Sequence, residues 1–212
     1  MPENDLKVLI EAARAAGDVA RRFNGPSAKL WHKPDDAGPV TEADLAVNEL
    51  LHQRLMQARP DYGWLSEETE DGAARLHSQR VFVIDPIDGT RSFIKGDGTW
   101  AHALAVADRG QVTAAVVYLP MLDKLYSAAI GQGAFLNGQA ITATDSESLA
   151  EAEVLTTRTN LEPQHWRGAV PVFQRATTAR PSPIGWRLLP KAALRRCSPS
   201  ATAGNGTSPP VR

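Results

Sequence analysis

The sequence predicts an α+β protein, because helical segments come first and short strands follow them without regular βαβ alternation. Apolar residues recur at helical spacing over residues 6–20 and again over residues 42–57. Residues 100–107, 111–119 and 124–129 are mostly apolar and are separated by short turns, which predicts an antiparallel meander. Helices packed on such a meander form a layered sandwich.

Each expected helix has one buried face. The apolar residues of the first are Leu6, Leu9, Ile10, Ala13, Gly17 and Ala20. The second begins after Thr41, where the segment Thr41-Glu42-Ala43-Asp44 has the form of a capping box. Its inward-facing residues are Val47, Leu50, Leu51 and Leu55. Asp44 therefore lies in the first turn of a helix.

An apolar, β-favouring stretch at residues 81–84 leads into two aspartates, Asp85 and Asp88. Pro86 stands between them and lacks a backbone donor, so we expect the strand to end there. Gly89 then allows the backbone to turn sharply. Both carboxylates should lie together at the C-terminal end of a strand.

A second apolar stretch, residues 62–65, leads into Glu67 and Glu68. Carboxylates gathered at strand ends raise one another's pKa unless a cation lies between them. Oxygen ligands of this kind suit Mg²⁺ or Mn²⁺ better than zinc. Residues 89–93 could begin a helical turn whose N–H groups face an anion, so the combination predicts a phosphate site.

The segment Asp-Pro-Ile-Asp-Gly-Thr-Arg-Ser-Phe at residues 85–93 resembles the signature of the inositol monophosphatase family of Mg²⁺-dependent, typically lithium-sensitive phosphomonoesterases. Three further segments fit in order: Val-Thr-Glu-Ala-Asp at 40–44, Glu-Glu at 67–68, and Gly-Gln-Gly-Ala-Phe-Leu-Asn-Gly at 131–138. The resemblance implies the layered α-β-α-β-α sandwich of the inositol monophosphatase and sugar phosphatase type. It also implies two or more Mg²⁺ ions, with Mn²⁺ as an alternative, and a homodimer.

The resemblance also implies roles for individual residues. Glu67 and Asp85 would bind the first metal with the carbonyl of Ile87, and Asp85 and Asp88 would share a second. Asp44 and Thr90 would orient the attacking water. The backbone N–H groups of Gly89 and Thr90 would hold the phosphate without a covalent intermediate.

Each of these motifs also has a structural interpretation. Residues 41–44 can simply cap a helix, and Glu67-Glu68 can be a solvated loop pair. Residues 85–88 can be a turn that ends a strand, and Lys95 can be a surface charge. Asn-Gly at 137–138 is a type I′ hairpin turn and carries no chemistry. His102 is expected to pack in a strand, and the order of the motifs along the chain favours a phosphatase.

The substrate is predicted from the context of the motifs. The Leu-Ser-Glu-Glu segment at 65–68 and Phe-Ile-Lys at 93–95 look more like the 3′(2′),5′-bisphosphate nucleotidase branch, in which Lys95 would meet a second phosphate. The best prediction is therefore hydrolysis of adenosine 3′,5′-bisphosphate to AMP and phosphate in sulfur assimilation. Inositol 1-phosphate is the alternative substrate.

The C-terminal part of the chain has a different composition. Residues 1–175 resemble the family, whereas residues 176–212 are rich in Pro, Ser, Thr, Gly and Arg and are expected to form an aberrant, disordered tail. No Trp-Asp dipeptide occurs, although the family completes its second metal site with one. The second half-domain is therefore expected to be incomplete.

Back-translation of residues 204–212, read two bases later, permits Glu-Trp-Asp-Val-Ala-Ala-Gly-Ala. We hypothesise a frameshift between about residues 170 and 180, which DNA unable to encode Trp-Asp in that frame would refute. The literal chain should then be poorly soluble and show weak or no turnover. An inactive, truncated family member is the non-enzymatic alternative.

The composition excludes several other classes of function. The 212 residues carry a net charge of −1, without a basic stripe, so a nucleic-acid polymer is not an expected partner. A small phosphorylated metabolite is. The chain shows no signal peptide and no membrane-spanning run, which predicts a cytoplasmic protein. Cys197, the single cysteine, is expected to be incidental.

Overall fold

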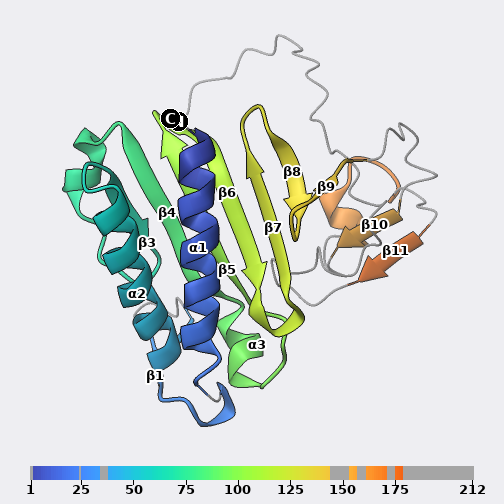
Figure 1. The fold of residues 1–212 in the computed structure, drawn as a ribbon. Coiled ribbons are helices and arrows are strands. Elements are labelled where there is room, and N and C mark those ends of the chain that lie inside the picture. The colour runs from blue at the N-terminus through green and yellow to red at the C-terminus, as the bar shows by residue number, and fades with distance from the viewer. Residues whose placement is uncertain are drawn as a thin grey trace, which may run out of the picture.

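The computed structural model describes residues 2–23, 25–33, 38–143, 153–156, 161–170 and 175–178. A seven-stranded mixed sheet forms their main body, with α1 (Pro2–Ala20) and α2 (Glu42–Ala58) side by side on one face (Figure 1). A third helix, α3 (Thr90–Ile94), follows directly after the fourth strand. Helices on one face of a largely antiparallel sheet confirm the predicted α+β class.

The strands of the sheet follow one another in the order β3-β4-β5-β6-β7-β8-β9. They are β3 (Gly63–Ser66), β4 (Arg80–Asp88), β5 (Ala101–Asp108), β6 (Gln111–Leu119), β7 (Lys124–Ala129), β8 (Gly133–Leu136) and β9 (Gln139–Ile141). β3 and β4 are parallel, and every later neighbour pairs antiparallel. Two smaller sheets pair β1 (Leu30–His32) with β2 (Pro39–Thr41), and β10 (Glu153–Thr156) with β11 (Arg175–Thr178).

The core lies between the sheet and the two long helices. α1 packs over β5, β6 and β7, and α2 packs over β4. The largest fully buried apolar side chains include Leu9, Leu51, Leu55, Phe82, Leu104 and Val116. Gly17 lets α1 approach the sheet closely, because a Cβ at this position would lie 2.7 Å from a ring carbon of Tyr118.

The predicted meander is confirmed with small shifts. β6 and β7 have the expected bounds, and β5 begins and ends one residue later than expected. The prediction that Pro86 ends its strand is wrong, because β4 continues to Asp88. The proline only interrupts the pairing with β5, and the ladder resumes after a bulge.

The predicted hairpin turn between β8 and β9 is confirmed by its backbone angles. Asn137 and Gly138 both have positive φ values, 50° and 78°, as a type I′ turn requires. The Asn137 side chain also accepts a hydrogen bond from the N–H of Leu125 (2.8 Å) and donates one to the carbonyl of Asp123 (2.7 Å). This asparagine therefore ties the turn to the start of β7.

The predicted tail begins at residue 176, and its first three residues belong to β11. Residues 179–212, with Cys197, lie outside the described residues. No helix in the described part of the chain is long and apolar enough to cross a membrane.

Candidate metal and phosphate site

The parallel pairing of β3 and β4 brings their C-terminal ends to the same edge of the sheet. Glu67 follows β3 directly, and its N–H donates to the carbonyl of Ile84 at 3.2 Å. Asp85 is the next residue along β4. The two acidic motifs, which lie well apart in the sequence, are thus neighbours in space as predicted.

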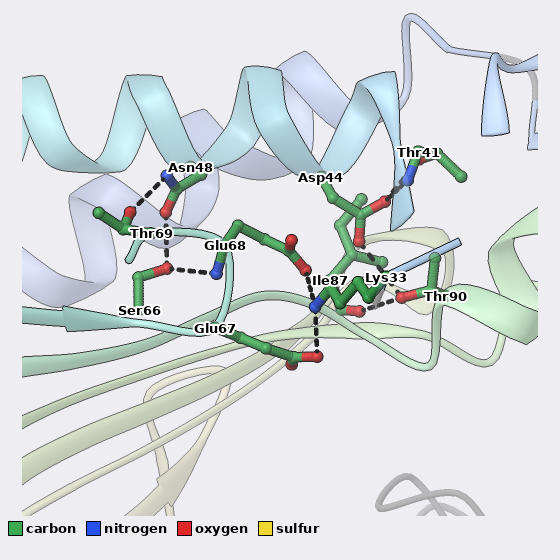
Figure 2. Close-up of polar contacts among 10 residues, drawn as sticks. All are labelled: Lys33, Thr41, Asp44, Asn48, Ser66, Glu67, Glu68, Thr69, Ile87 and Thr90. Carbon is green, nitrogen blue, oxygen red and sulfur yellow. Dashed lines mark hydrogen bonds and ion pairs between the residues drawn. The ribbon is translucent and has the colours of Figure 1, made fainter. Parts of the chain in front are cut away.

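Asp44 is buried in the first turn of α2 and has hydrogen-bond donors on both carboxylate oxygens. Its Oδ2 accepts from the N–H and the hydroxyl of Thr41 (2.8 and 2.5 Å), and its Oδ1 lies 3.2 Å from Oγ1 of Thr90 (Figure 2). Oγ1 of Thr90 also lies 3.1 Å from the carbonyl oxygen of Ile87. We call Thr41, Asp44, Ile87 and Thr90 the Asp44 cluster. The predicted cap and the predicted Asp44–Thr90 pair therefore coexist.

Asn48 lies one helical turn after Asp44 and holds the loop that follows β3. Its Oδ1 accepts from the hydroxyl of Ser66 (2.6 Å), and its Nδ2 donates to Oγ1 of Thr69 (3.0 Å). The hydroxyl oxygen of Ser66 lies 3.3 Å from the N–H of Glu68. One face of α2 thereby contacts both regions: Asp44 reaches Thr90, just after the end of β4, and Asn48 reaches Ser66 at the end of β3.

Lys33 provides a positive charge between two of the carboxylates. Its Nζ lies 2.8 Å from Oε1 of Glu67 and 2.7 Å from Oε1 of Glu68 (Figure 2). Burial lowers the pKa of Lys33, but the hydrogen bonds to Glu67 and Glu68 outweigh burial and raise it above its usual value. The ammonium group therefore stays charged and occupies a position suited to a cation.

Asp85 is surrounded by other acids. Burial raises its pKa from 3.8 to about 8, helped by the charges of Glu67, Asp88, Asp44 and Glu68. We call Glu67, Glu68, Asp85 and Asp88 the acidic cluster. Its negative charges repel one another and are only partly balanced by Lys33.

Other members of the two clusters show the same effect. The pKa of Asp88 is raised to about 6 by burial and by Glu67. Burial raises the pKa of Asp44 as well, against the opposing hydrogen bonds from Thr41 and Thr90. Glu68 also has a raised pKa through burial, opposed by Lys33. These carboxyl groups thus hold their protons more tightly than free ones.

The chemistry of the acidic cluster fits a hard divalent cation. All its side-chain donors are oxygens, and a cation, the ammonium of Lys33, already binds two of them. Among the side chains that the structure describes, no three His, Cys, Asp or Glu groups form a ready-made metal site. The ligand atoms and their charge therefore fit a divalent cation. Their present arrangement, however, is around the ammonium group of Lys33.

The helical turn expected after Asp88 begins where the sequence predicts it. Gly89 caps α3 with a φ of 93°, a left-handed conformation that favours glycine. Its carbonyl accepts hydrogen bonds from the N–H groups of Ser92 and Phe93 (2.8 and 3.1 Å). The backbone therefore turns directly after Asp88, beside the acidic cluster.

The comparisons with known proteins agree with this arrangement. A family model described as the inositol monophosphatase family matches residues 1–197. This chain belongs to the inositol monophosphatase family.

Curated relatives of this family member carry several names. It is 34% identical over 157 residues to an inositol-1-monophosphatase of Rhizobium meliloti, covering 71% of this chain and 57% of the relative. It is 36% identical to a histidinol-phosphatase of Chlorobaculum parvum (72% and 58% covered). It is also 36% identical to the 3′(2′),5′-bisphosphate nucleotidase CysQ of Escherichia coli (60% and 52% covered). The chain thus spans less than two thirds of the length of these relatives.

Solved structures show the same fold. The extragenic suppressor protein suhB from Bartonella henselae is 31% identical, with a TM-score of 0.64, covering 73% of this chain and 60% of that one. A staphylococcal inositol monophosphatase soaked in LiCl is 23% identical, with a TM-score of 0.67 and coverage of 76% and 60%, which shows the fold alone.

Proposed function

We propose that this chain carries the metal and phosphate end of a Mg²⁺-dependent phosphomonoesterase that acts on a small phosphorylated metabolite. The main support is the state of Asp85, whose pKa is raised to about 8 by burial and by the other acids around it. Perturbed carboxylates gathered at strand ends are typical of functional sites. Family membership supports the same reaction class.

Glu67, Asp85, Asp88 and the carbonyl of Ile87 are proposed to hold two or more Mg²⁺ ions, and the same oxygen ligands would accept Mn²⁺. When bound, the metal would supply Lewis acidity to the phosphate oxygens and lower the pKa of water at the site. Lys33 would have to release Glu67, because its Nζ lies 2.8 Å from that carboxylate.

The Asp44 cluster is proposed to handle the proton. Thr90 Oγ1 lies 3.2 Å from Oδ1 of Asp44, so the hydroxyl can give its own proton to the carboxylate while its oxygen takes one from water. Burial raises the pKa of Asp44 and makes it a stronger base than a free aspartate. The N–H groups of Gly89 and Thr90 are proposed to bind the phosphate oxygens, so no serine or cysteine nucleophile is needed.

Three candidate substrates fit the proposed reaction. The relatives named above include an inositol monophosphatase, a histidinol-phosphatase and a bisphosphate nucleotidase. Our preference for adenosine 3′,5′-bisphosphate depends on the Leu-Ser-Glu-Glu segment at 65–68 and on Lys95, which is exposed at the C-terminal end of α3. Inositol 1-phosphate and histidinol phosphate are therefore tested beside it.

The test is phosphate release by the purified chain from these three compounds, with Mg²⁺ or with EDTA, beside the Asp85→Asn variant. Release that needs both Mg²⁺ and Asp85 would support the proposal, and the preferred compound would name the substrate. Release that persists in EDTA would contradict it. Metal binding without release from any compound would favour the alternative of an inactive family member.

A further inference from the structure

The bulge between Asp85 and Asp88 leaves part of β4 without regular ladder partners. The ladder pairs Asp85 with Ala103 of β5 and then resumes with Asp88 opposite Ala101. Two residues of β4 therefore face a single residue of β5, His102. Bulges of this kind aim neighbouring side chains and need support from the surrounding structure.

His102 supplies that support with its side chain. Its Nδ1 is hydrogen-bonded to the carbonyl oxygen of Pro86, the first residue of the bulge. A carbonyl oxygen only accepts, so Nδ1 carries the proton and donates. The side chain thus supplies a hydrogen bond to the backbone of the bulge.

The surroundings of His102 fix the ring in this orientation. The side chain is fully buried, and its ring packs edge-on against Trp100, with centroids 5.5 Å apart, and lies 6.3 Å from the ring of Tyr118. Burial lowers the pKa of His102 to about 4. The neutral ring therefore has one N–H, which donates a hydrogen bond to the carbonyl oxygen of Pro86.

Packing alone does not explain a histidine at this position. Nε2 is buried and has no hydrogen-bond partner among the described residues. An unpaired buried polar atom costs about 1–3 kcal/mol of stability, which an apolar side chain of similar size would avoid. The donor at Nδ1 is the property that distinguishes histidine from such a side chain.

We propose that His102 is a positioning residue for the metal site: its hydrogen bond to Pro86 fixes the bulge that presents Asp85, Ile87 and Asp88 together. This inference rests on the proposed function, because these three residues are the proposed ligands on β4. Removing a group that orients a metal ligand in this way typically weakens metal binding by about 10- to 100-fold.

Two variants separate positioning from packing. His102→Leu keeps most of the volume and removes the donor, whereas His102→Asn keeps a donor near the position of Nδ1 and leaves a cavity. Mn²⁺ affinity is measured by calorimetry on the whole chain, and thermal unfolding is measured in EDTA. We expect His102→Leu to bind Mn²⁺ about 10-fold more weakly, and His102→Asn to bind it more tightly than His102→Leu despite a lower unfolding temperature.

The outcomes are distinct. Mn²⁺ affinity that is unchanged in His102→Leu, or that simply follows the unfolding temperature in both variants, would overturn the positioning role. A wild-type chain that binds Mn²⁺ no better than Asp85→Asn would instead refute the proposed metal site, and the role of His102 with it.

Discussion

The Asp44 cluster and the acidic cluster lie side by side, but they differ in the partners that the fold provides for their carboxyl groups. In the first, a single carboxylate is matched by neutral donors from Thr41 and Thr90. In the second, Lys33 pairs with Glu67 and Glu68 alone, and no ion pair among the described residues reaches Asp85 or Asp88. Folding therefore gives the Asp44 carboxylate hydrogen-bond donors on both oxygens, whereas it leaves the acidic cluster with more carboxyl groups than one ammonium group can balance.

This difference indicates which groups serve the fold and which serve a ligand. A buried group whose partners are all present stabilises the protein as it stands. Like charges crowded together at a partly exposed site destabilise it until a cation binds, and the binding energy of that cation then adds to stability. The comparison predicts that removing charge from the acidic cluster makes the metal-free protein more stable and abolishes its metal binding.

The largest effect is expected from Asp85→Asn. Loss of the central carboxylate should weaken Mn²⁺ binding by about 100-fold or more, since a ligand is removed outright. The same change should raise the unfolding temperature in EDTA at pH 8, because asparagine carries no charge to repel Glu67 and Asp88. Calorimetry and thermal unfolding measure the two effects.

Asp61→Asn is the matched control for this variant, because Asp61 is exposed and precedes β3 at the end opposite Glu67. It should change neither measurement. If Asp85→Asn destabilised the metal-free chain at pH 8, the contrast between the two clusters would be wrong.

Thr90→Val should lower the rate constant kcat for phosphate release by about 100-fold, because the hydroxyl that links water to Asp44 is lost. Thr90→Ser keeps the hydroxyl and should stay within a few-fold of the wild-type rate, on the same reasoning. Steady-state phosphate release measures both. Equal rates in the valine and serine variants would remove Thr90 from the proposed proton path.

The metal-free chain should lose stability as the pH rises from about 4 to about 8. The folded-state pKa of Asp85 is about 8, against 3.8 for a free aspartate, so the folded state holds an extra proton in this range. Raising the pH removes that proton and with it the stability. We expect the unfolding temperature in EDTA to be roughly 5 °C lower at pH 8 than at pH 5.

Asp85→Asn should flatten this pH dependence, and saturating Mg²⁺ should reverse it by favouring the ionised carboxylate. Thermal unfolding across the pH range, with and without Mg²⁺, measures the three cases. An unfolding temperature that increases with pH in EDTA would contradict the sign.

The smallest effect is expected from Lys33→Met. Glu67 and Glu68 lose their counter-charge, so the metal-free chain should lose about 1 kcal/mol of unfolding free energy. Mg²⁺ should remove the difference, because it supplies the missing charge. Denaturant unfolding measures this, with the exposed Lys29→Met as control. A loss of stability that persists in saturating Mg²⁺ would show that Lys33 has a separate structural role.

Much of the fold could be predicted from the sequence because its signals are local. β6 and β7 were predictable from apolar runs between turn residues, and α2 from its spacing and its capping box. The type I′ turn at Asn137 follows from two residue types. The placement of Glu67 beside Asp85 needed one further assumption, that β3 and β4 are parallel.

The remaining features depend on contacts between distant segments. Lys33 lies in a Pro- and Gly-rich segment, and nothing local shows that it pairs with Glu67 and Glu68. The bulge at Pro86 and its bond to His102 also need the register of two strands. The sequence placed His102 correctly in a packed strand but gave no reason to assign it a partner.

The domain boundary at residue 175 stays a prediction. The family match runs to residue 197, and the strand β11 spans Arg175–Thr178. Local composition alone suggested the change at residue 176. Nucleotide sequence would test the frameshift hypothesis directly.

The central claim is that the acidic cluster is a divalent-cation site. The most direct test is a crystal of this chain soaked in Mn²⁺, with the metal located by its anomalous scattering. We predict a peak within coordination distance of Asp85, with the Lys33 ammonium displaced from Glu67. Anomalous peaks found only elsewhere, with Lys33 still between Glu67 and Glu68, would contradict the account.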